Sequence, residues 1–229
     1  MPPPEESLTS REARLLGQVK RGLQGWWPGN RRPFPWRELD DEYLRLMAEV
    51  LLQRTRAESV AKVWSEFATT YSSPAALASS SDAKLRALIA SLGLGNKRTA
   101  NLRALAATLD ELGAIPDSRA ELVALPGVGP YTAQVWLATC RHDRGWVVDS
   151  NIRRVLTRVL AGEEEVPMRK LRRYVTRLLE KGDPTTVVFG LVDLGSSPCK
   201  PRSPDCPSCP MTRFCTWAKT HRQVGARAS

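Results

Sequence analysis

The segment Leu125-Pro-Gly-Val-Gly-Pro130 constrains the fold of this 229-residue chain more than any other feature. Apolar residues recur at helical spacing on both sides of it, so one helix ends here and another begins a few residues later. Pro126 stops the first helix, and Gly127 and Gly129 permit a tight turn, because glycine takes backbone conformations that a side chain disfavours. We therefore expect two helices joined by a short hairpin.

The same helical period runs through the rest of the chain, and no alternating pattern typical of strands repeats. The sequence therefore predicts an all-α protein. Three prolines and a glycine between Trp26 and Arg37 predict a loop there. The expected helices are 10–26, 44–51, 60–67, a short one from Pro74, 83–92 with Asp82 as its N-cap, 97–112, 119–125 with Ser118 as its cap, 132–140, 151–161, 168–181 and 185–195.

The charge of the chain favours a polyanionic partner. There are 34 Lys and Arg residues against 24 Asp and Glu, a formal net charge of +10, and DNA or RNA is the first partner to consider. A merely basic protein is the alternative that charge alone leaves open. No stretch approaches the roughly 18 apolar residues of a membrane span, and the first residues lack the features of a secretory signal. We expect a cytoplasmic, nucleoid-associated protein without membrane contact.

The hairpin is suited to holding a phosphate group. Its glycines leave main-chain amides accessible at the N-terminus of the second helix, which carries a partial positive charge. Gly127, Val128, Gly129 and Thr132 are therefore candidates for contacts with a nucleic-acid backbone, which position a protein without reading sequence. The alternative is a plain corner between two helices with glycine at the cap, and the basic, all-helical context favours the DNA-binding hairpin.

Four of the five cysteines lie within 17 residues near the C-terminus, spaced C-x6-C-x2-C-x5-C. In a reducing compartment such a cluster points to a metal centre and not to disulfides. Four thiolates can hold a [4Fe–4S] cluster or a zinc ion, although zinc ribbons usually show two C-x2-C pairs and this chain has one. The candidate ligands are Cys199, Cys206, Cys209 and Cys215.

Five segments, in this order along the chain, together resemble the helix-hairpin-helix DNA glycosylase superfamily, which contains endonuclease III and the adenine-DNA glycosylases. They are Phe34-Pro-Trp-Arg37, Ala48-Glu-Val-Leu-Leu-Gln-Arg-Thr55, the hairpin through Ala133, Val147-Val-Asp-Ser-Asn-Ile-Arg-Arg-Val-Leu156, and the cysteine cluster.

The resemblance spans about residues 30–217 and implies a two-lobed fold. A six-helix barrel with the hairpin would occupy 40–145, and residues 10–39 with 146–220 would form an iron–sulfur cluster lobe. Residues 1–9 would be a disordered N-terminus and 221–229 a flexible tail. The cysteine spacing equals that of endonuclease III, so the resemblance implies a [4Fe–4S] cluster, and proteins with this hairpin often hold a monovalent cation on its carbonyls.

The resemblance makes Asp149 the catalytic residue, because it lies 20 residues after Gly129, where the family keeps its aspartate. Breaking an N-glycosidic bond builds positive charge on the sugar, and a carboxylate beside C1′ stabilises that state. Asp149 is also a good N-cap for a helix starting at Asn151. The two roles are compatible.

Tyr131 occupies the hairpin position where endonuclease III-like enzymes carry a lysine that forms a Schiff base and then cuts the strand. Tyrosine cannot do this, so we expect a monofunctional glycosylase that uses water and leaves an abasic site. Glu49 matches a glutamate that protonates the leaving purine in the adenine enzymes. A thymine–guanine mismatch enzyme keeps the same glutamate, and a solvated helix residue is the plain alternative.

The target base must leave the stack, and other residues must fill the gap. Gln53 and Arg54 occupy the wedge positions of the family, and Lys97 belongs to a loop that can probe the opposite strand. Arg37 is a candidate to reach the base pocket or a phosphate.

The sequence does not fix which base is removed. Tyr131 with Asp149, the short loop after Gly93 and the end of the chain soon after the cysteines favour thymine or uracil opposite guanine. The segment Glu49-Val-Leu-Leu-Gln53 keeps adenine opposite guanine or 8-oxoguanine as the alternative. From other classes, we weigh a catalytically inactive iron–sulfur DNA-binding protein and a zinc-bearing RNA-binding module. In the favoured case the protein is a monomer acting on double-stranded DNA.

Overall fold

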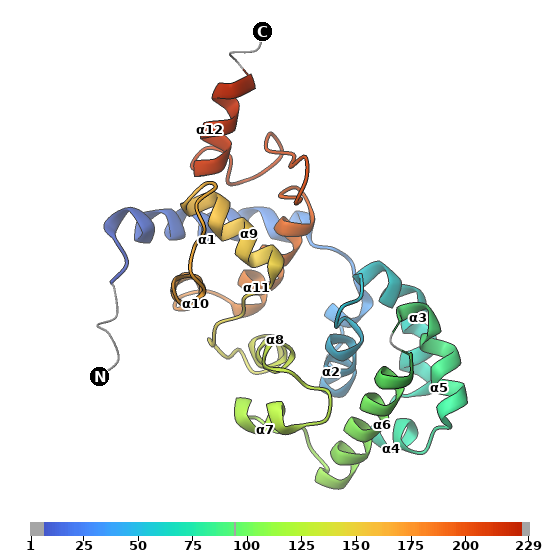
Figure 1. Ribbon diagram of the computed structural model, residues 1–229. Coiled ribbons are helices and arrows are strands. Elements are labelled where there is room, and N and C mark those ends of the chain that lie inside the picture. Colours follow the sequence, from blue (N-terminus) through green and yellow to red (C-terminus); the bar gives the residue numbers. More distant parts are fainter. Residues whose placement is uncertain (1–6, 94, 226–229) are drawn as a thin grey trace. The chain divides into compact units, whose positions relative to one another are not determined.

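The computed structural model describes residues 7–93 and 95–225, with only the backbone described from residue 222 onward. Within these ranges every regular element is a helix and no strand occurs, so the prediction of an all-α protein is confirmed. None of the described helices is long and apolar enough to cross a membrane. The helices fall into two compact units, Pro33–Arg141 and a second formed by Met1–Arg32 with His142–Ser229 (Figure 1). We call them the hairpin unit and the cysteine unit.

The hairpin unit contains the elements between the two segments of the cysteine unit. They are η1 (Pro35–Arg37), α2 (Glu42–Leu51), α3 (Ala57–Thr70), α4 (Pro74–Ala78), α5 (Asp82–Ile89), η2 (Ala90–Leu92), α6 (Gly95–Leu112), α7 (Arg119–Ala124) and α8 (Pro130–Cys140). Side chains cap several of them as the sequence predicts, Ser73 before α4 and Ser118 before α7. Helix α5 is capped by Ser81 and not by Asp82, which is its first helical residue.

Aromatic side chains build one side of the core of the hairpin unit. Phe34 stacks on Trp36 with ring centroids 4.8 Å apart, Trp36 meets Trp64 edge to face, and the series continues through Phe67 to Tyr71. Trp36 is 4% exposed, so η1 is anchored in the core of its own unit. Such pairs add about 0.5–1.5 kcal/mol each beyond the area they bury.

The cysteine unit has five described helices (Figure 1). They are α1 (Ser10–Asn30), α9 (Ser150–Leu160), α10 (Met168–Leu179), α11 (Pro184–Ser196) and α12 (Thr216–Gly225). A capping box of Thr9 and Glu12 starts α1. Of the segment 1–9 that we expected to be disordered, residues 1–6 lie outside the described residues. Helix α12, which the sequence did not predict, takes up residues 221–225 of the expected tail, and 226–229 lie outside the described residues.

The loop expected from Trp26 to Arg37 is wrong in its first part, because α1 continues to Asn30 with Pro28 inside it. A proline in a helix removes one hydrogen bond and costs about 3 kcal/mol. Tertiary contacts oppose that cost: the Trp27 indole nitrogen donates to the Asp193 carboxylate at 3.0 Å, and Asp193 on α11 is 1% exposed. A packed anchor of this kind outweighs a local propensity.

Candidate functional site

The turn between α7 and α8 is a type II β-turn. The Val128 amide donates to the Leu125 carbonyl at 3.1 Å, with Pro126 in the second position and Gly127 in the third. The φ angle of Gly127 is +74°, which is the left-handed value that this turn requires at its third position. Helix α6 lies against the turn, since a Cβ added to Gly127 would be 3.1 Å from the Asn101 Cβ. Glycine is therefore needed at 127 for both conformation and space.

Glycine is not required at position 129. We expected both hairpin glycines to adopt backbone conformations that a side chain disfavours, and this is wrong for Gly129. Its φ is −88° and its ψ 169°, which is ordinary extended backbone, and an added Cβ would meet nothing within 4 Å. Gly129 is the N-cap of α8, and no side chain caps that helix at its N-terminus. The cap residue is open and small beside the first amides of α8.

Two other hairpin residues have buried side chains. Val128 is 5% exposed and Thr132 is 2% exposed. Their side chains are part of the interior of the hairpin unit. The Val128 amide is used by the turn, since it donates to the Leu125 carbonyl, which leaves the Thr132 main-chain amide as the group able to hold a phosphate oxygen.

Gln53 connects the turn after α2 to the hairpin. Its amide nitrogen donates to the Gly127 carbonyl at 2.8 Å and to the Thr132 hydroxyl at 3.1 Å. The next residue, Arg54, is exposed and has a positive φ of 56°. Left-handed backbone is uncommon outside glycine and is found where surrounding structure holds it. The side chain of Gln53 is thus engaged inward, while Arg54 is held at the tip of the turn.

A hollow of about 300 Å³ lies beside this turn within the hairpin unit. Its lining is mainly basic and amide side chains: Val50, Gln53, Arg54, Lys97, Arg98 and Asn101. Lys97 is exposed and Arg98 is buried. The structure thus brings the predicted residues Gln53, Arg54 and Lys97 together around one hollow, next to the hairpin.

Asp149 is the N-cap of α9 in the cysteine unit. One carboxylate oxygen accepts from the Ile152 amide at 2.7 Å, and the other accepts from the side-chain nitrogen of Asn151 at 3.2 Å. Burial raises the pKa of Asp149, and these two hydrogen bonds and the charge of Arg154 oppose the rise only in part. The prediction that Asp149 caps this helix is confirmed, and the cap holds the carboxylate in a fixed orientation.

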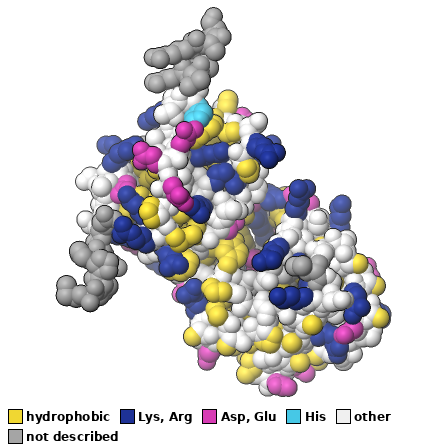
Figure 2. All heavy atoms as spheres, viewed as in Figure 1, with side chains coloured by type: hydrophobic (Ala, Val, Ile, Leu, Met, Phe, Trp, Pro, Cys, Tyr) yellow, Lys and Arg dark blue, Asp and Glu magenta, His cyan; other side chains and the backbone are white. Residues whose placement is uncertain are grey.

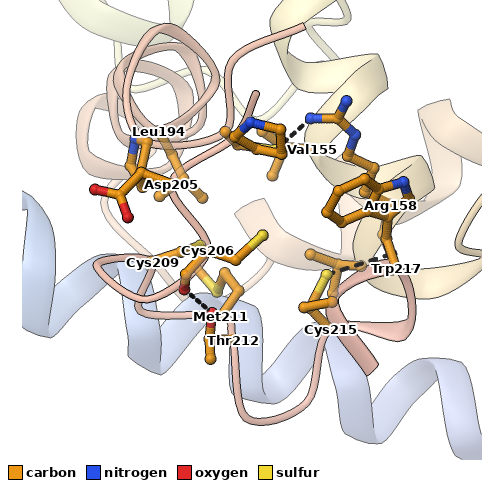
Figure 3. Close-up of a pocket in the computed structure, with 15 residues that line it drawn as sticks. Val155, Arg158, Leu194, Asp205, Cys206, Cys209, Met211, Thr212, Cys215 and Trp217 are labelled. Carbon is orange, nitrogen blue, oxygen red and sulfur yellow. Dashed lines mark hydrogen bonds between the residues drawn. The ribbon is translucent and has the colours of Figure 1, made fainter. Parts of the chain in front are cut away.

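All four C-terminal cysteines line one cavity of the cysteine unit (Figure 3). Cys206, Cys209 and Cys215 are arranged around the same space in that view, and none of the chain's cysteines is in a disulfide. Burial raises the pKa of Cys209 to about 12, and the proximity of Cys199, Cys215 and Cys206 adds to the rise. Four thiols that line one cavity are the donor set expected of a site for a cationic metal centre.

Two arginines of α9 hold the first cysteine. Arg154 donates to the Cys199 carbonyl at 2.9 Å, and Arg158 approaches the Cys199 sulfur at 3.4 Å and donates to the Lys200 carbonyl at 2.7 Å. Arg158 also lies 4.9 Å from the ring of Trp217. The helix that begins at Asp149 is therefore bonded directly to the cysteine-bearing segment.

Residues 47–181 match the family model of the HhH-GPD superfamily base excision DNA repair proteins. The chain belongs to this family. A "Thymine/uracil-DNA glycosylase" of Methanothermobacter thermautotrophicus is 31% identical to it over 84% of this chain and 89% of the relative. An "Adenine DNA glycosylase" of Mycobacterium tuberculosis strain H37Rv is 30% identical over 93% of this chain and 71% of the relative. The solved structure of a thermostable thymine-DNA glycosylase superposes with a TM-score of 0.82 at 28% identity, covering 90% of this chain and 98% of the other.

The remaining predicted site residues of this HhH-GPD protein occupy three different surroundings. Glu49 is half-buried on α2 between the buried residues Ala48 and Val50, unlike a fully solvated helix residue. Tyr131 is 40% exposed in the first turn of α8. The Arg37 guanidinium lies 5.3 Å from the centre of the Phe34 ring.

The loop expected to carry Lys97 is wrong in its second part, because Lys97 and Arg98 lie in the first turn of α6. Two supporting roles in the hairpin unit were also not predicted from the sequence. Asn101 lies against Gly127, and the buried Arg98 donates to the turn after α2. Neither is part of the hairpin segment, and both are polar residues within an ordinary helical run. The one available signal was that Arg98 falls on the same face of α6 as the buried residues Leu102 and Leu105, where a charged side chain is rare unless it is hydrogen-bonded.

Proposed function

We propose that this protein is a DNA glycosylase that hydrolyses the N-glycosidic bond of thymine or uracil opposite guanine and leaves an abasic site. The observation that carries the proposal is Asp149, a partly buried carboxylate fixed by two hydrogen bonds at the start of α9 in a chain of a base excision repair family. The relatives named as thymine glycosylases support the choice of base.

The reaction needs a group that stabilises positive charge on the sugar. As the bond from C1′ to the base breaks, its electron pair leaves with the base and the sugar becomes oxocarbenium-like. The Asp149 carboxylate is the fixed negative charge for that state. A water molecule then bonds to C1′ and loses a proton, and the released base gains one. Glu49 is the candidate for placing the base or supplying its proton.

Tyr131 supports hydrolysis without strand cleavage. A lyase step needs a primary amine that bonds to C1′ of the abasic sugar while the oxygen on C1′ leaves as water, which gives a Schiff base. A phenol cannot form a Schiff base. Tyr131 stands where lyase members of the superfamily carry their lysine. We therefore assign water as the nucleophile and exclude tyrosine from a covalent step.

We propose that the protein acts on double-stranded DNA as a monomer, and three features support the binding to DNA. The hairpin presents the main-chain amide of Thr132, in the first turn of α8, beside an open Gly129, a geometry suited to phosphate. The segment carrying the cysteines exposes Lys200, Arg202 and Arg213. Lys and Arg side chains are spread over the face of the molecule in Figure 2, in keeping with the net charge of +10. Binding should therefore weaken steeply with salt.

Adenine opposite guanine or 8-oxoguanine is the second candidate substrate. It is favoured by Glu49 on α2 and by the relative named as an adenine glycosylase. In that case Glu49 would protonate the purine as it leaves. A catalytically inactive DNA-binding protein of the same fold is the remaining alternative, and it predicts binding without base release.

We propose that Cys199, Cys206, Cys209 and Cys215 hold a [4Fe–4S] cluster. Among the described residues no group of three or more His, Cys, Asp or Glu side chains is arranged to hold a metal ion, and the four thiols line a common cavity. The cysteine spacing supports the cluster over zinc, because it contains one C-x2-C pair and zinc ribbons usually contain two. Once bound, the cluster would order residues 199–215, and we assign it no step in catalysis.

A monovalent cation on the hairpin turn is a further proposal. Main-chain carbonyl oxygens would hold it. Those of Leu125 and Gly127 already accept one hydrogen bond each, from Val128 and Gln53, and a carbonyl has a second lone pair for a cation.

The test is base release from a panel of duplexes containing T:G, U:G, A:G and A:8-oxoguanine pairs, each analysed with and without alkali. The expected result is cleavage only after alkali, and fastest for T:G or U:G. Strand cleavage before alkali would refute the hydrolytic assignment, and preference for an A-containing pair would establish the second candidate. DNA binding without any release would establish the inactive alternative.

A further inference from the structure

Arg98 on α6 is a buried charge whose hydrogen bonds all go to one short turn. It is 6% exposed. Its guanidinium donates to the Leu51 carbonyl at 2.5 Å, to the Gln53 carbonyl at 3.0 Å and to the Thr55 hydroxyl at 2.9 Å. Burial lowers the pKa of Arg98. Among the described residues, no carboxylate lies within ion-pair distance of it.

Burying an arginine without a carboxylate partner costs free energy. Here the hydrogen bonds from the planar guanidinium to three oxygen acceptors offset that cost. Two of the three acceptors are main-chain carbonyls at the end of α2 and in the turn that follows. The Leu51 carbonyl depends on Arg98, because the last carbonyls of a helix have no partner within it. The Gln53 carbonyl also accepts from the Thr55 hydroxyl at 3.2 Å, and that hydroxyl is itself an acceptor for Arg98. Arg98 therefore fixes the backbone path over Leu51–Thr55.

The backbone path over Leu51–Thr55 determines the placement of two residues: Arg54, which is exposed, and Gln53, which reaches the hairpin. Arg54 has its positive φ of 56° inside the clamped stretch, and such backbone persists only where neighbouring structure holds it. Gln53 reaches from the same stretch to the Gly127 carbonyl and the Thr132 hydroxyl. Releasing the clamp would free both the strained residue and the bridge to the hairpin.

We propose that Arg98 is a positioning residue for base flipping: it holds the turn after α2 so that Arg54 is rigidly placed to fill the space of the extruded base. The inference rests on the proposed function. Arg98 itself is not the group that meets DNA, since its guanidinium is buried and hydrogen-bonded to protein. The hairpin amides, which hold phosphate, do not depend on it directly.

A flipping role has a signature that a purely structural role lacks. Extrusion costs least when the base has no partner opposite it. Loss of Arg98 should therefore slow release of thymine from a T:G duplex much more than release of thymine opposite a stable abasic analogue. A structural defect would lower both rates by the same factor.

The experiment compares Arg98→Gln with Arg103→Gln. Arg103 is also on α6, but it donates to Asp82 and the Ala78 carbonyl and is 38% exposed, so its substitution is a matched control. Because Arg98→Gln can weaken folding, a second variant, Thr55→Val, leaves the arginine in place. It removes one acceptor of Arg98 and also the hydroxyl's own donation to the Gln53 or Leu92 carbonyl. Flipping is read directly from the fluorescence of 2-aminopurine placed next to the T:G pair, and base release from single-turnover rates.

We expect Arg98→Gln to lose the fluorescence rise on binding and to slow T:G release by at least about tenfold, with less than about threefold loss opposite the abasic analogue. Thr55→Val should show a smaller loss with the same asymmetry, and Arg103→Gln none. Duplex affinity should stay within about threefold of the wild type. An undiminished fluorescence rise, or equal rate losses on both substrates, would overturn the proposal.

The proposed function fails on a separate result, namely that the wild type and Arg103→Gln release no base from any duplex of the panel. The fluorescence comparison still decides the role of Arg98 in that event, because it reports extrusion of the base and requires no bond cleavage.

Discussion

The hairpin glycines offer a prediction whose size follows from the structure. Gly127 has a φ of +74°, and a Cβ there would be 3.1 Å from the Asn101 Cβ. A non-glycine residue in left-handed backbone costs about 1–2 kcal/mol, and overpacking against a helix adds about 1–2 kcal/mol more. Gly127→Ala should therefore destabilise the protein by about 2–4 kcal/mol. For a chain of this size, 1 kcal/mol corresponds to about 2–4 °C in Tm, so we expect a decrease of roughly 4–16 °C.

Two matched variants separate the contributions. Gly113 ends α6 with a φ of +68° and open space around it, so Gly113→Ala measures backbone strain alone, about 1–2 kcal/mol. Gly129 has neither strain nor a close neighbour, but it is the N-cap of α8. Ala is a poorer N-cap than Gly, and its lower entropy in the unfolded chain offsets part of that loss, so Gly129→Ala should cost less than about 1 kcal/mol. Thermal unfolding followed by circular dichroism gives the three values under identical conditions.

DNA binding completes the comparison. Gly127→Ala should lower affinity by a similar factor for every duplex offered, because phosphate contacts do not depend on the base. Any loss of DNA affinity in Gly129→Ala would then mean that the added methyl group obstructs the phosphate while the hairpin remains folded. A Tm for Gly127→Ala no lower than that of Gly113→Ala would contradict crowding against Asn101. A loss of affinity that depends strongly on the target base would contradict phosphate binding by the hairpin.

Four further predictions concern other residues. Asp149→Asn should abolish base release and keep the helix cap. Because burial raises the pKa of Asp149, ionisation of this carboxyl lowers the stability of the wild type as pH rises through that pKa. The variant should therefore have a higher Tm than the wild type at neutral pH, by a margin that shrinks in acid. Burial opposes ionisation of Glu12, but hydrogen bonds from Lys170, Tyr174 and Thr9 outweigh it and lower its pKa to about 2; Glu12→Gln should therefore cost about 2–3 kcal/mol at pH 7 and progressively less between about pH 4.5 and 2, measured by denaturant unfolding across pH. Tyr131→Lys should produce strand cleavage before alkali and a covalent adduct trapped by borohydride, both missing in the wild type. Cys209→Ser should lose absorbance near 400 nm in the purified protein, whereas Cys140→Ser, outside the cavity, should retain it.

The helical class and most helix positions could be predicted from sequence because helical periodicity is a local property. The hairpin, with its proline and glycine at the positions a type II turn demands, was predictable for the same reason. Asp149 as an N-cap was likewise visible, since a cap depends on residues three positions apart. Two of the errors, in α1 and at Gly129, arose where local rules were overridden or not needed. Trp27 anchored a helix past Pro28, and Gly129 adopted a conformation open to any residue.

What sequence could not supply is the support of the site by residues distant in the chain. Gln53 lies 74 residues from the Gly127 carbonyl that it binds, and Arg98 lies 47 residues from Leu51. No periodic or motif-based rule relates such positions, because their proximity is a product of the folded core. Gln53 is an example. Its place in the segment Ala48–Thr55 predicts contact with DNA, and its hydrogen bonds to Gly127 and Thr132 also hold the hairpin in position.

The same distribution of support explains why a short hairpin can be a precise phosphate-binding element. A two-helix corner with exposed amides would by itself move with the ends of α7 and α8. Here the Gly127 carbonyl is fixed from α2 through Gln53, the turn after α2 is fixed from α6 through Arg98, and α6 lies directly against Gly127 through Asn101. These contacts form a closed ring, in which each element restrains the next. Each variant should therefore act mainly on the element that it touches. Arg98→Gln should displace Arg54 and leave phosphate binding nearly unchanged, whereas Gly127→Ala should weaken phosphate binding, so binding and flipping have to be measured separately.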